Sequence, residues 1–224
     1  DFCLSRGLGD VYKRQVIAPA DALVEAPKSV PLVDAAGLPS VALTARQALF
    51  DDGGLEAGQR VLIVGAGGVV GKYAIALAKR AGAHVIATAS PRSADAVRAA
   101  GADEIIDHTE TDVLDAVTEQ VDLLLNLAPI EPDEFTALVR LVRDGGVVVS
   151  TTAWMPAPDD AGRGVRSVVV FVRSDTEKLA ELVSLVDNGA LVLEVTRRIP
   201  LTELQALHAE AAEGPISGKV IIIP

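Results

Sequence analysis

Three glycines at intervals of three residues form the clearest motif of the sequence. Gly65, Gly68 and Gly71 follow the apolar run 61–64 and open a stretch with helical periodicity. In such a unit the first glycine permits a tight turn, the second lets the backbone approach a phosphate, and the third lets the helix pack closely. The free N–H groups and positive dipole end of the helix attract the anion. The pattern predicts that residues 65–71 bind the pyrophosphate of a dinucleotide.

The end of the second apolar run indicates which dinucleotide is bound. A site for NAD usually carries Asp or Glu about 20 residues beyond the first glycine, where it binds the ribose 2′-hydroxyl. Residues 87–93 contain no acid and offer Ser90 and Arg92 instead. A carboxylate would repel the 2′-phosphate of NADP, whereas a hydroxyl can hydrogen-bond to it and a guanidinium can pair with it. These residues predict NADP(H); the alternative is that Arg92 is only a solvated residue in the first turn of a helix.

From residue 60 onward the sequence alternates between β-branched runs and amphipathic stretches, which is typical of a parallel sheet with crossover helices. Strands are expected at 61–64, 85–88, 104–106, 121–126, 147–150 and 167–172. Helices are expected at 69–81, at 111–119, at 132–142, and from Ser90, as N-cap, to Gly101. This order predicts an α/β fold with a doubly wound parallel sheet of the Rossmann type. Outside it, helices are expected at 176–187 and 202–213, and strands at 191–196 and 220–223.

Composition excludes several classes of function. The net charge of −11 argues against binding to nucleic acids or anionic membranes, because both require basic patches. No apolar run approaches the roughly 18 residues that span a bilayer, so we expect a cytoplasmic enzyme. The single cysteine, Cys3, allows no disulfide framework, and the three histidines lie far apart in the chain, so no metal site is expected in this sequence.

The first fifteen residues differ from the rest. Residues 5–15 resemble a transposase-type sequencing adapter translated as coding sequence, and residues 1–15 show no hydrophobic periodicity. We therefore expect residues 1–15 to be a non-native scar, as an expression tag would be, and the natural chain to be truncated at its N-terminus. A natural N-terminal arm is the alternative.

Several motifs together resemble the medium-chain dehydrogenase/reductase superfamily, in its zinc-free quinone oxidoreductase (zeta-crystallin-like) branch. The motifs are residues 38–45, the strand, loop and helix at 61–79, the Gly101-Ala102-Asp103 turn followed by Ile106-Asp107, and residues 218–221. The resemblance implies remnants of a GroES-like catalytic domain at both ends, with its N-terminal tail at 16–40 and a returning segment at 176–224. Residues 41–175 would form the NADP-binding Rossmann domain.

The resemblance also implies positions for the cofactor-binding residues. Thr44 would lie near the nicotinamide end, with Leu127 and Ala128 packing near the ring. Ser150, Thr151 and Phe171, the last in the sixth strand, would line the same cleft, and His108 stands where many relatives have a tyrosine near the 2′-phosphate. The expected cofactor-binding set is Thr44, Gly65, Ala66, Gly67, Gly68, Val69, Val70, Gly71, Ser90, Arg92, His108, Leu127, Ala128, Ser150, Thr151 and Phe171.

The function that follows is hydride transfer from NADPH to a quinone or an α,β-unsaturated carbonyl, in a homodimer paired through the strand at 167–172. The cofactor carries the chemistry, so the residues required for catalysis are not identified. Alternatives are a catalytically inactive NADP-binding module, or a relative of zinc-dependent alcohol dehydrogenases whose metal site lies in a missing half. An S-adenosylmethionine methyltransferase would usually need an acid at the end of the second strand, and none is present.

Overall fold

The computed structural model describes residues 17–152, 155, 157–214 and 216–224. The chain divides into two compact units, Ser40–Arg173 and a second unit formed by the residues up to Pro39 together with Ser174–Pro224. The adapter-like residues 1–15, Cys3 and Val16 lie outside the described residues, as do residues 153, 154, 156 and 215.

The unit Ser40–Arg173 is built on one parallel sheet. Its strands are β1 (Arg60–Val64), β2 (His84–Ala89), β3 (Glu104–Asp107), β4 (Val121–Asn126), β5 (Val142–Ser150) and β6 (Arg166–Val169). They lie in the order β3-β2-β1-β4-β5-β6, with every neighbouring pair parallel. This order confirms the doubly wound Rossmann prediction. The order in which the chain adds strands to the sheet reverses between β1 and β4. Ligands of such sheets bind at the carboxyl ends of the strands beside that point.

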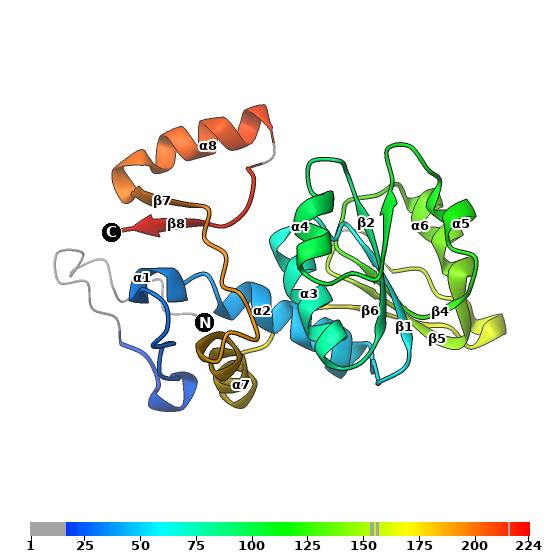
Figure 1. Cartoon of the computed structure of the whole chain (residues 1–224), viewed down its shortest axis with the longest axis horizontal. Helices are drawn as coiled ribbons and strands as arrows, with labels where there is room; N and C mark the ends of the chain where they lie inside the picture. Colours follow the sequence, from blue (N-terminus) through cyan, green and yellow to red (C-terminus); the bar gives the residue numbers. More distant parts are fainter. Residues whose placement is uncertain (1–16, 153–154, 156, 215) are drawn as a thin grey trace. The chain divides into compact units, whose positions relative to one another are not determined.

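Helices cover both faces of this sheet (Figure 1). The helices α3 (Val69–Arg80) and α4 (Ala94–Ala99) lie on one face, and α5 (Val113–Ala116) and α6 (Pro132–Leu138) lie on the other, where the short η4 (Val139–Leu141) follows α6. Because alternate strand residues face opposite sides, Leu62, Leu124 and Val148 pack into one cluster with Phe135 and Leu138. The core is therefore aliphatic, as the 3% aromatic content requires.

The segment that enters this unit is helical, which the sequence analysis did not anticipate. The helix α2 (Pro39–Arg46) continues into the π-helical turn η3 (Gln47–Asp52). Gln47 is buried, and its amide donates to the Arg173 carbonyl (2.8 Å) and accepts from the Arg173 N–H (2.9 Å). One side chain thus joins the first helix of the unit to its last residue.

Three expected elements of this unit need correction. The helix after β2 begins at Ala94 with Ser93 at the N-cap position, so Ser90 and Pro91 lie in the preceding turn. The helix expected at 111–119 is the single turn α5, because Val117 becomes extended (φ −87°, ψ 100°) and buries its side chain. The sixth strand ends at Val169, so Phe171 lies just beyond it and is 68% exposed.

The second unit contains a small parallel sheet and its own helices. Its elements are η2 (Ala20–Ala22), α1 (Leu32–Ala35), α7 (Thr176–Asp187), β7 (Arg197–Pro200), η6 (Leu201–Glu203), α8 (Leu204–Glu213) and β8 (Val220–Ile223). The prediction of a strand at 191–196 is wrong. The strand that pairs with β8 is β7, in the register Arg197 with Val220, and Val192 is 78% exposed. The Arg198 guanidinium donates two hydrogen bonds to the buried Asp34 carboxylate, which holds the pKa of Asp34 below its usual value.

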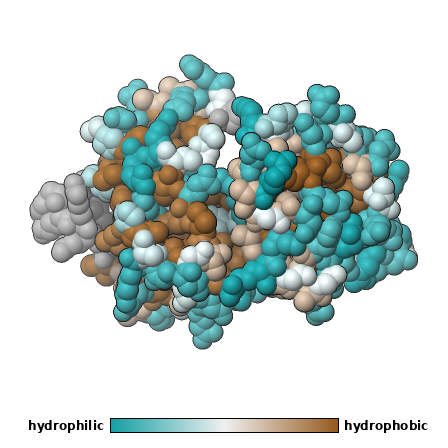
Figure 2. All heavy atoms as spheres, viewed as in Figure 1, coloured by the Kyte–Doolittle hydropathy of each residue, from teal (hydrophilic) through white to brown (hydrophobic). Residues whose placement is uncertain are grey.

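The surface carries both hydrophilic and hydrophobic side chains. On the face drawn in Figure 2, hydrophilic residues cover much of the area and hydrophobic residues gather in patches between them. Among the described residues, no helix combines the length and the apolar character needed to cross a bilayer.

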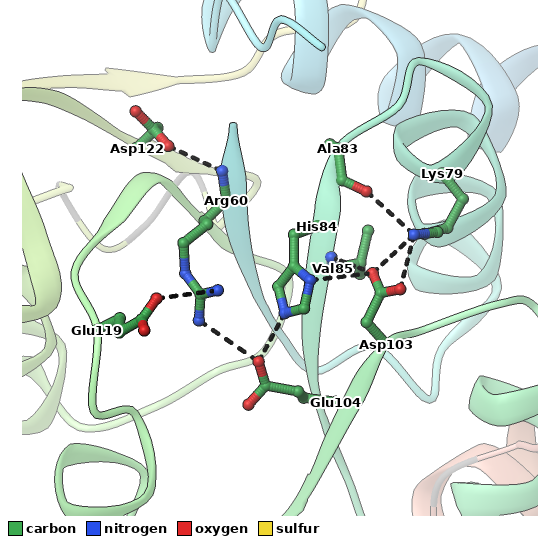
Figure 3. A network of polar contacts seen from close by, with 9 residues as sticks. All are labelled: Arg60, Lys79, Ala83, His84, Val85, Asp103, Glu104, Glu119 and Asp122. Carbon is green, nitrogen blue, oxygen red and sulfur yellow. Dashed lines mark hydrogen bonds and ion pairs between the residues drawn. The ribbon is translucent and has the colours of Figure 1, made fainter. Parts of the chain in front are cut away.

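A charged network lies at the amino ends of β1, β2 and β3, opposite the edge where ligands bind (Figure 3). Lys79 Nζ contacts both carboxylate oxygens of Asp103 (2.7 and 2.8 Å), and the Val85 N–H donates to the same carboxylate (2.7 Å). The His84 ring and the Arg60 guanidinium both contact Glu104 (2.6 and 3.4 Å). Burial alone would raise the pKa of Asp103, but these hydrogen bonds and the Lys79 charge outweigh it, so that its pKa lies below the usual 3.8.

We expect Asp103→Asn to lower the free energy of unfolding by about 1–2 kcal/mol at pH 7, because Lys79 and the Val85 N–H lose their charged acceptor. A carboxyl with a depressed pKa stabilises the fold above about pH 4, and this contribution disappears as the pH falls through the folded-state pKa. Urea unfolding at pH 7 and pH 3 measures this, with Asp159→Asn as control, because Asp159 is exposed and has no hydrogen bond or ion pair with any described residue. An equal deficit at both pH values would contradict the assignment.

Candidate functional site

The glycine-rich loop joins β1 to α3 and is held in place by β2. Gly65 has the left-handed φ of +78° that the tight turn requires. Its N–H donates to the Thr88 hydroxyl (3.0 Å), and the Ala66 N–H donates to the Thr88 carbonyl (3.2 Å). Thr88 is buried at the carboxyl end of β2, so the shape of the loop is set by the neighbouring strand.

The glycines of the loop serve different purposes. A Cβ on Gly71 would lie 2.6 Å from both the carbonyl carbon and Cα of Ala66, so the helix can approach the loop only without a side chain there. A Cβ on Gly65 would lie 2.8 Å from the Ala128 Cβ. A Cβ on Gly68, in contrast, would meet nothing closer than the Gly65 carbonyl oxygen at 3.7 Å. The packing of the chain itself therefore requires glycine at positions 65 and 71 but leaves open space beside position 68.

The open space beside Gly68 lies at the N-terminus of α3. Gly68 is the N-cap residue and is exposed, and no side chain caps the helix. The N–H groups of Val69, Val70 and Gly71 belong to the first turn, where the helix itself supplies no acceptor. An anion placed there would receive these hydrogen bonds and interact with the positive end of the helix dipole.

The strand β4 ends beside this loop. The Leu127 N–H donates to the Val64 carbonyl (2.9 Å), which extends the pairing of β4 with β1 by one residue. Asn126 is fully buried, and its Oδ1 accepts a hydrogen bond from the Ala128 N–H (3.2 Å). This bond holds the turn after β4, which places Ala128 against Gly65. The backbone of residues 127 and 128 is thus fixed against the first glycine of the loop.

A cavity of about 800 Å³ opens at the carboxyl ends of β1, β2 and β3. Gly65, Thr88, His108 and Ala128 contribute to its wall, and α5 and α6 close its other side. The wall also contains Glu110, Asp112, Glu131 and Glu134, and none of the residues that line it is Lys or Arg. An acidic wall disfavours a phosphate but suits an uncharged base with hydrogen-bond donors, so phosphates are better placed at the N-terminus of α3.

The turn after β2 lies against the loop from the other side. Ser93 Oγ accepts from the Ser90 N–H and donates to the Ser90 carbonyl (both 3.2 Å). Neither the Ser90 hydroxyl nor the exposed Arg92 guanidinium makes a hydrogen bond or ion pair with any described residue. Both groups are therefore available to a ligand.

The structure brings some of the expected cofactor-binding residues together and leaves others apart. Gly65, His108 and Ala128 meet at the cavity, whereas Ser150, Thr151 and Phe171 do not line it. Ser150 is buried and hydrogen-bonded to Thr152 (2.7 Å), and Thr151 Oγ1 donates to the Asn126 carbonyl (3.4 Å). Thr44 donates to Ser40 within α2 (2.8 Å). The roles of these residues stay predictions.

Sequence reasoning missed three residues that position the site: Thr88, Ser93 and Asn126. The positions of Thr88 and Asn126 could have been recognised in the sequence, since each is a polar residue that follows an apolar run at the carboxyl end of its strand. The position of Ser93 could not, because its contact with Gly67 joins residues far apart in the sequence.

The parallel sheet, the glycine-rich turn and the helix N-terminus together define a dinucleotide-binding α/β domain. Residues 100–222 match the family model described as zinc-binding dehydrogenase. The chain belongs to this family, within the medium-chain dehydrogenase/reductase superfamily.

Curated relatives and solved structures agree with this assignment. The mouse mitochondrial NAD(P)H oxidoreductase RTN4IP1 is 31% identical, over 92% of this chain and 59% of its own length. The chloroplast envelope quinone oxidoreductase homolog of Arabidopsis thaliana is 29% identical, over 93% of this chain and 67% of its own. The quinone oxidoreductase structure from Coxiella burnetii superimposes with a TM-score of 0.80 at 29% identity, covering 89% of this chain and 63% of that one. The chain thus spans about three fifths to two thirds of the length of these proteins.

The family name raises the question of zinc. Among the described residues, no group of three or more His, Cys, Asp or Glu side chains is arranged to hold a metal ion. The expected absence of a metal site stays a prediction. The expected place of the chain in the zinc-free branch stays a prediction.

Proposed function

We propose that this chain is the cofactor-binding part of an NADPH-dependent oxidoreductase that reduces a quinone or an α,β-unsaturated carbonyl. The observation that carries the proposal is the turn after β2, which contains no acid and presents the Ser90 hydroxyl and the Arg92 guanidinium, neither of which has a partner among the described residues. A hydroxyl and a guanidinium suit a 2′-phosphate, and the carboxylate typical of NAD sites is absent. Relatives named as NAD(P)H and quinone oxidoreductases support the reaction class.

In this proposal each part of the site has one task. The N–H groups of residues 69–71 bind the pyrophosphate, and the acidic cavity between β2 and α6 receives the adenine. The backbone at Leu127 and Ala128, fixed by Asn126, bounds the path toward the nicotinamide. A bound nicotinamide supplies the hydride, so this chain has only to hold it, orient it and exclude water.

Titration with NADPH and NADH, followed by the fluorescence of the reduced nicotinamide, tests the cofactor preference. We expect NADPH to bind at least about tenfold more tightly, which corresponds to roughly one charge-assisted hydrogen bond. Equal affinity for the two cofactors would contradict the proposal.

A nucleotide-binding module without catalysis is the second candidate. It requires only that residues 65–71 and the turn after β2 bind a dinucleotide, and it gives no residue a part in a reaction. Oxidation of NADPH by the chain in the presence of a quinone separates the two: turnover supports the reductase, and tight binding without turnover supports the module.

A further inference from the structure

The glycine-rich loop and the turn after β2 interlock through one side chain. Ser93 sits directly over Gly67: a Cβ on Gly67 would lie 2.6 Å from the Ser93 Cβ and closer still to its Oγ. Beyond the immediate chain neighbours, no other atom of the described residues comes within 4 Å of that position. Within the described part of the chain, Ser93 is therefore the residue that requires the absence of a side chain at Gly67.

Ser93 also fixes the turn internally. Its hydroxyl bridges the N–H and the carbonyl of Ser90, and its own N–H donates to the same carbonyl (2.9 Å). The peptide groups on both sides of Ser90 are thus held in one orientation, which also sets the direction in which the Ser90 side chain leaves the backbone. Arg92 lies within the same turn.

We propose that Ser93 is the positioning residue that sets the preference for NADPH over NADH. This inference rests on the proposed function, because it assumes that the turn binds the 2′-phosphate. The loop holds the pyrophosphate and the turn holds the 2′-phosphate, and the contact between Gly67 and Ser93 fixes the spacing between the two phosphate sites. NADH has only a hydroxyl at the second site, so its binding depends little on that spacing.

The test compares the dissociation constants of NADPH and NADH for the native chain and for Ser93→Ala. We expect NADPH to bind roughly tenfold more weakly to the variant, as the loss of two hydrogen bonds implies, while the value for NADH changes by less than about twofold. Ser184→Ala is the matched control, because it removes a hydroxyl whose one hydrogen bond among the described residues is to the Ala180 carbonyl in α7 (3.0 Å). It should change neither constant.

The outcomes distinguish the role of Ser93 from the proposed binding of NADPH on which it rests. A native chain without preference for NADPH overturns both. A native preference that survives Ser93→Ala, or a variant that loses both cofactors equally, overturns the role of Ser93 and leaves the proposed function standing.

A second pair of variants tests the contact itself by thermal unfolding without cofactor. Gly67→Ala should lower the melting temperature, because the new methyl group collides with Ser93. In a Ser93→Gly background, Gly67→Ala should lower the melting temperature much less than it does in the native chain, since among the described residues only Ser93 occupies the space. An equal loss from Gly67→Ala in both backgrounds would show that Ser93 does not lock the loop, and would overturn the inference.

Discussion

Gly71→Ala is expected to lower the free energy of unfolding by about 1–2 kcal/mol and to abolish measurable binding of NADPH. The added Cβ would lie 2.6 Å from backbone atoms of Ala66, which cannot move aside as a flexible side chain could. Alanine in a helix gains about 0.5–1 kcal/mol over glycine, but overpacking against fixed atoms costs more, typically 1–3 kcal/mol and occasionally beyond. The helix α3 must then shift away from the loop, and its N–H groups move with it.

Gly68→Ala is the matched control for this prediction. The Cβ at position 68 would have ordinary contacts in the cofactor-free protein, and its φ of −76° suits alanine. We expect a loss of less than about 1 kcal/mol, the usual cost of a poorer N-cap residue. Binding of NADPH should still fall at least about tenfold, because the methyl group occupies the space that a phosphate would approach.

Urea unfolding without cofactor and fluorescence titration with NADPH measure the two effects separately. A Gly71→Ala chain as stable as the native one would contradict the packing argument. A Gly68→Ala chain that binds NADPH as tightly as the native one would contradict the assignment of the open space to a phosphate.

Arg92→Glu is expected to weaken the binding of NADPH by about 100-fold and to change that of NADH by less than about threefold. The substitution removes a charge-assisted hydrogen bond, worth about 1.5–3 kcal/mol, and places a negative charge near the 2′-phosphate. Because Arg92 is exposed and has no partner among the described residues, stability should be unchanged.

Arg140→Glu is the control for the same change of charge. Arg140 is exposed in η4, which precedes β5 and so lies at the amino edge of the sheet. The substitution Arg140→Glu should weaken the binding of NADPH and of NADH only slightly. If Arg92→Glu and Arg140→Glu affected NADPH equally, the effect would reflect net charge alone, and the local role of Arg92 would be wrong.

The sequence predicted those parts of the fold that depend on local pattern. The strand β1 contains the continuous apolar run 61–64 and β4 contains the run 123–125, and α3 ends at Arg80, one residue from its expected end. The elements that were wrong depend on contacts between distant residues. Val117 leaves the helical conformation to bury its side chain, and β7 lies where β8 can pair with it.

The candidate site divides in the same way. The glycines of the loop were evident because their spacing reflects a local strand–turn–helix geometry. The hydrogen bond from Gly65 to Thr88 and the contact of Gly67 with Ser93 were not evident from the sequence. Each of them joins the loop after β1 to the segment at the end of β2, more than 20 residues further along the chain. Ser90 was expected to cap a helix, whereas Ser93 stands at that position and holds the turn.

Residues 65–71 are proposed to hold the pyrophosphate of a dinucleotide. The most direct test follows the backbone amide signals of the chain by NMR during titration with NADP⁺. We expect the largest shifts at Val69, Val70 and Gly71, whose N–H groups would donate to the phosphates, and none at His84 or Asp103, at the opposite edge of the sheet. Saturable binding that leaves the signals of residues 69–71 unmoved would contradict the claim.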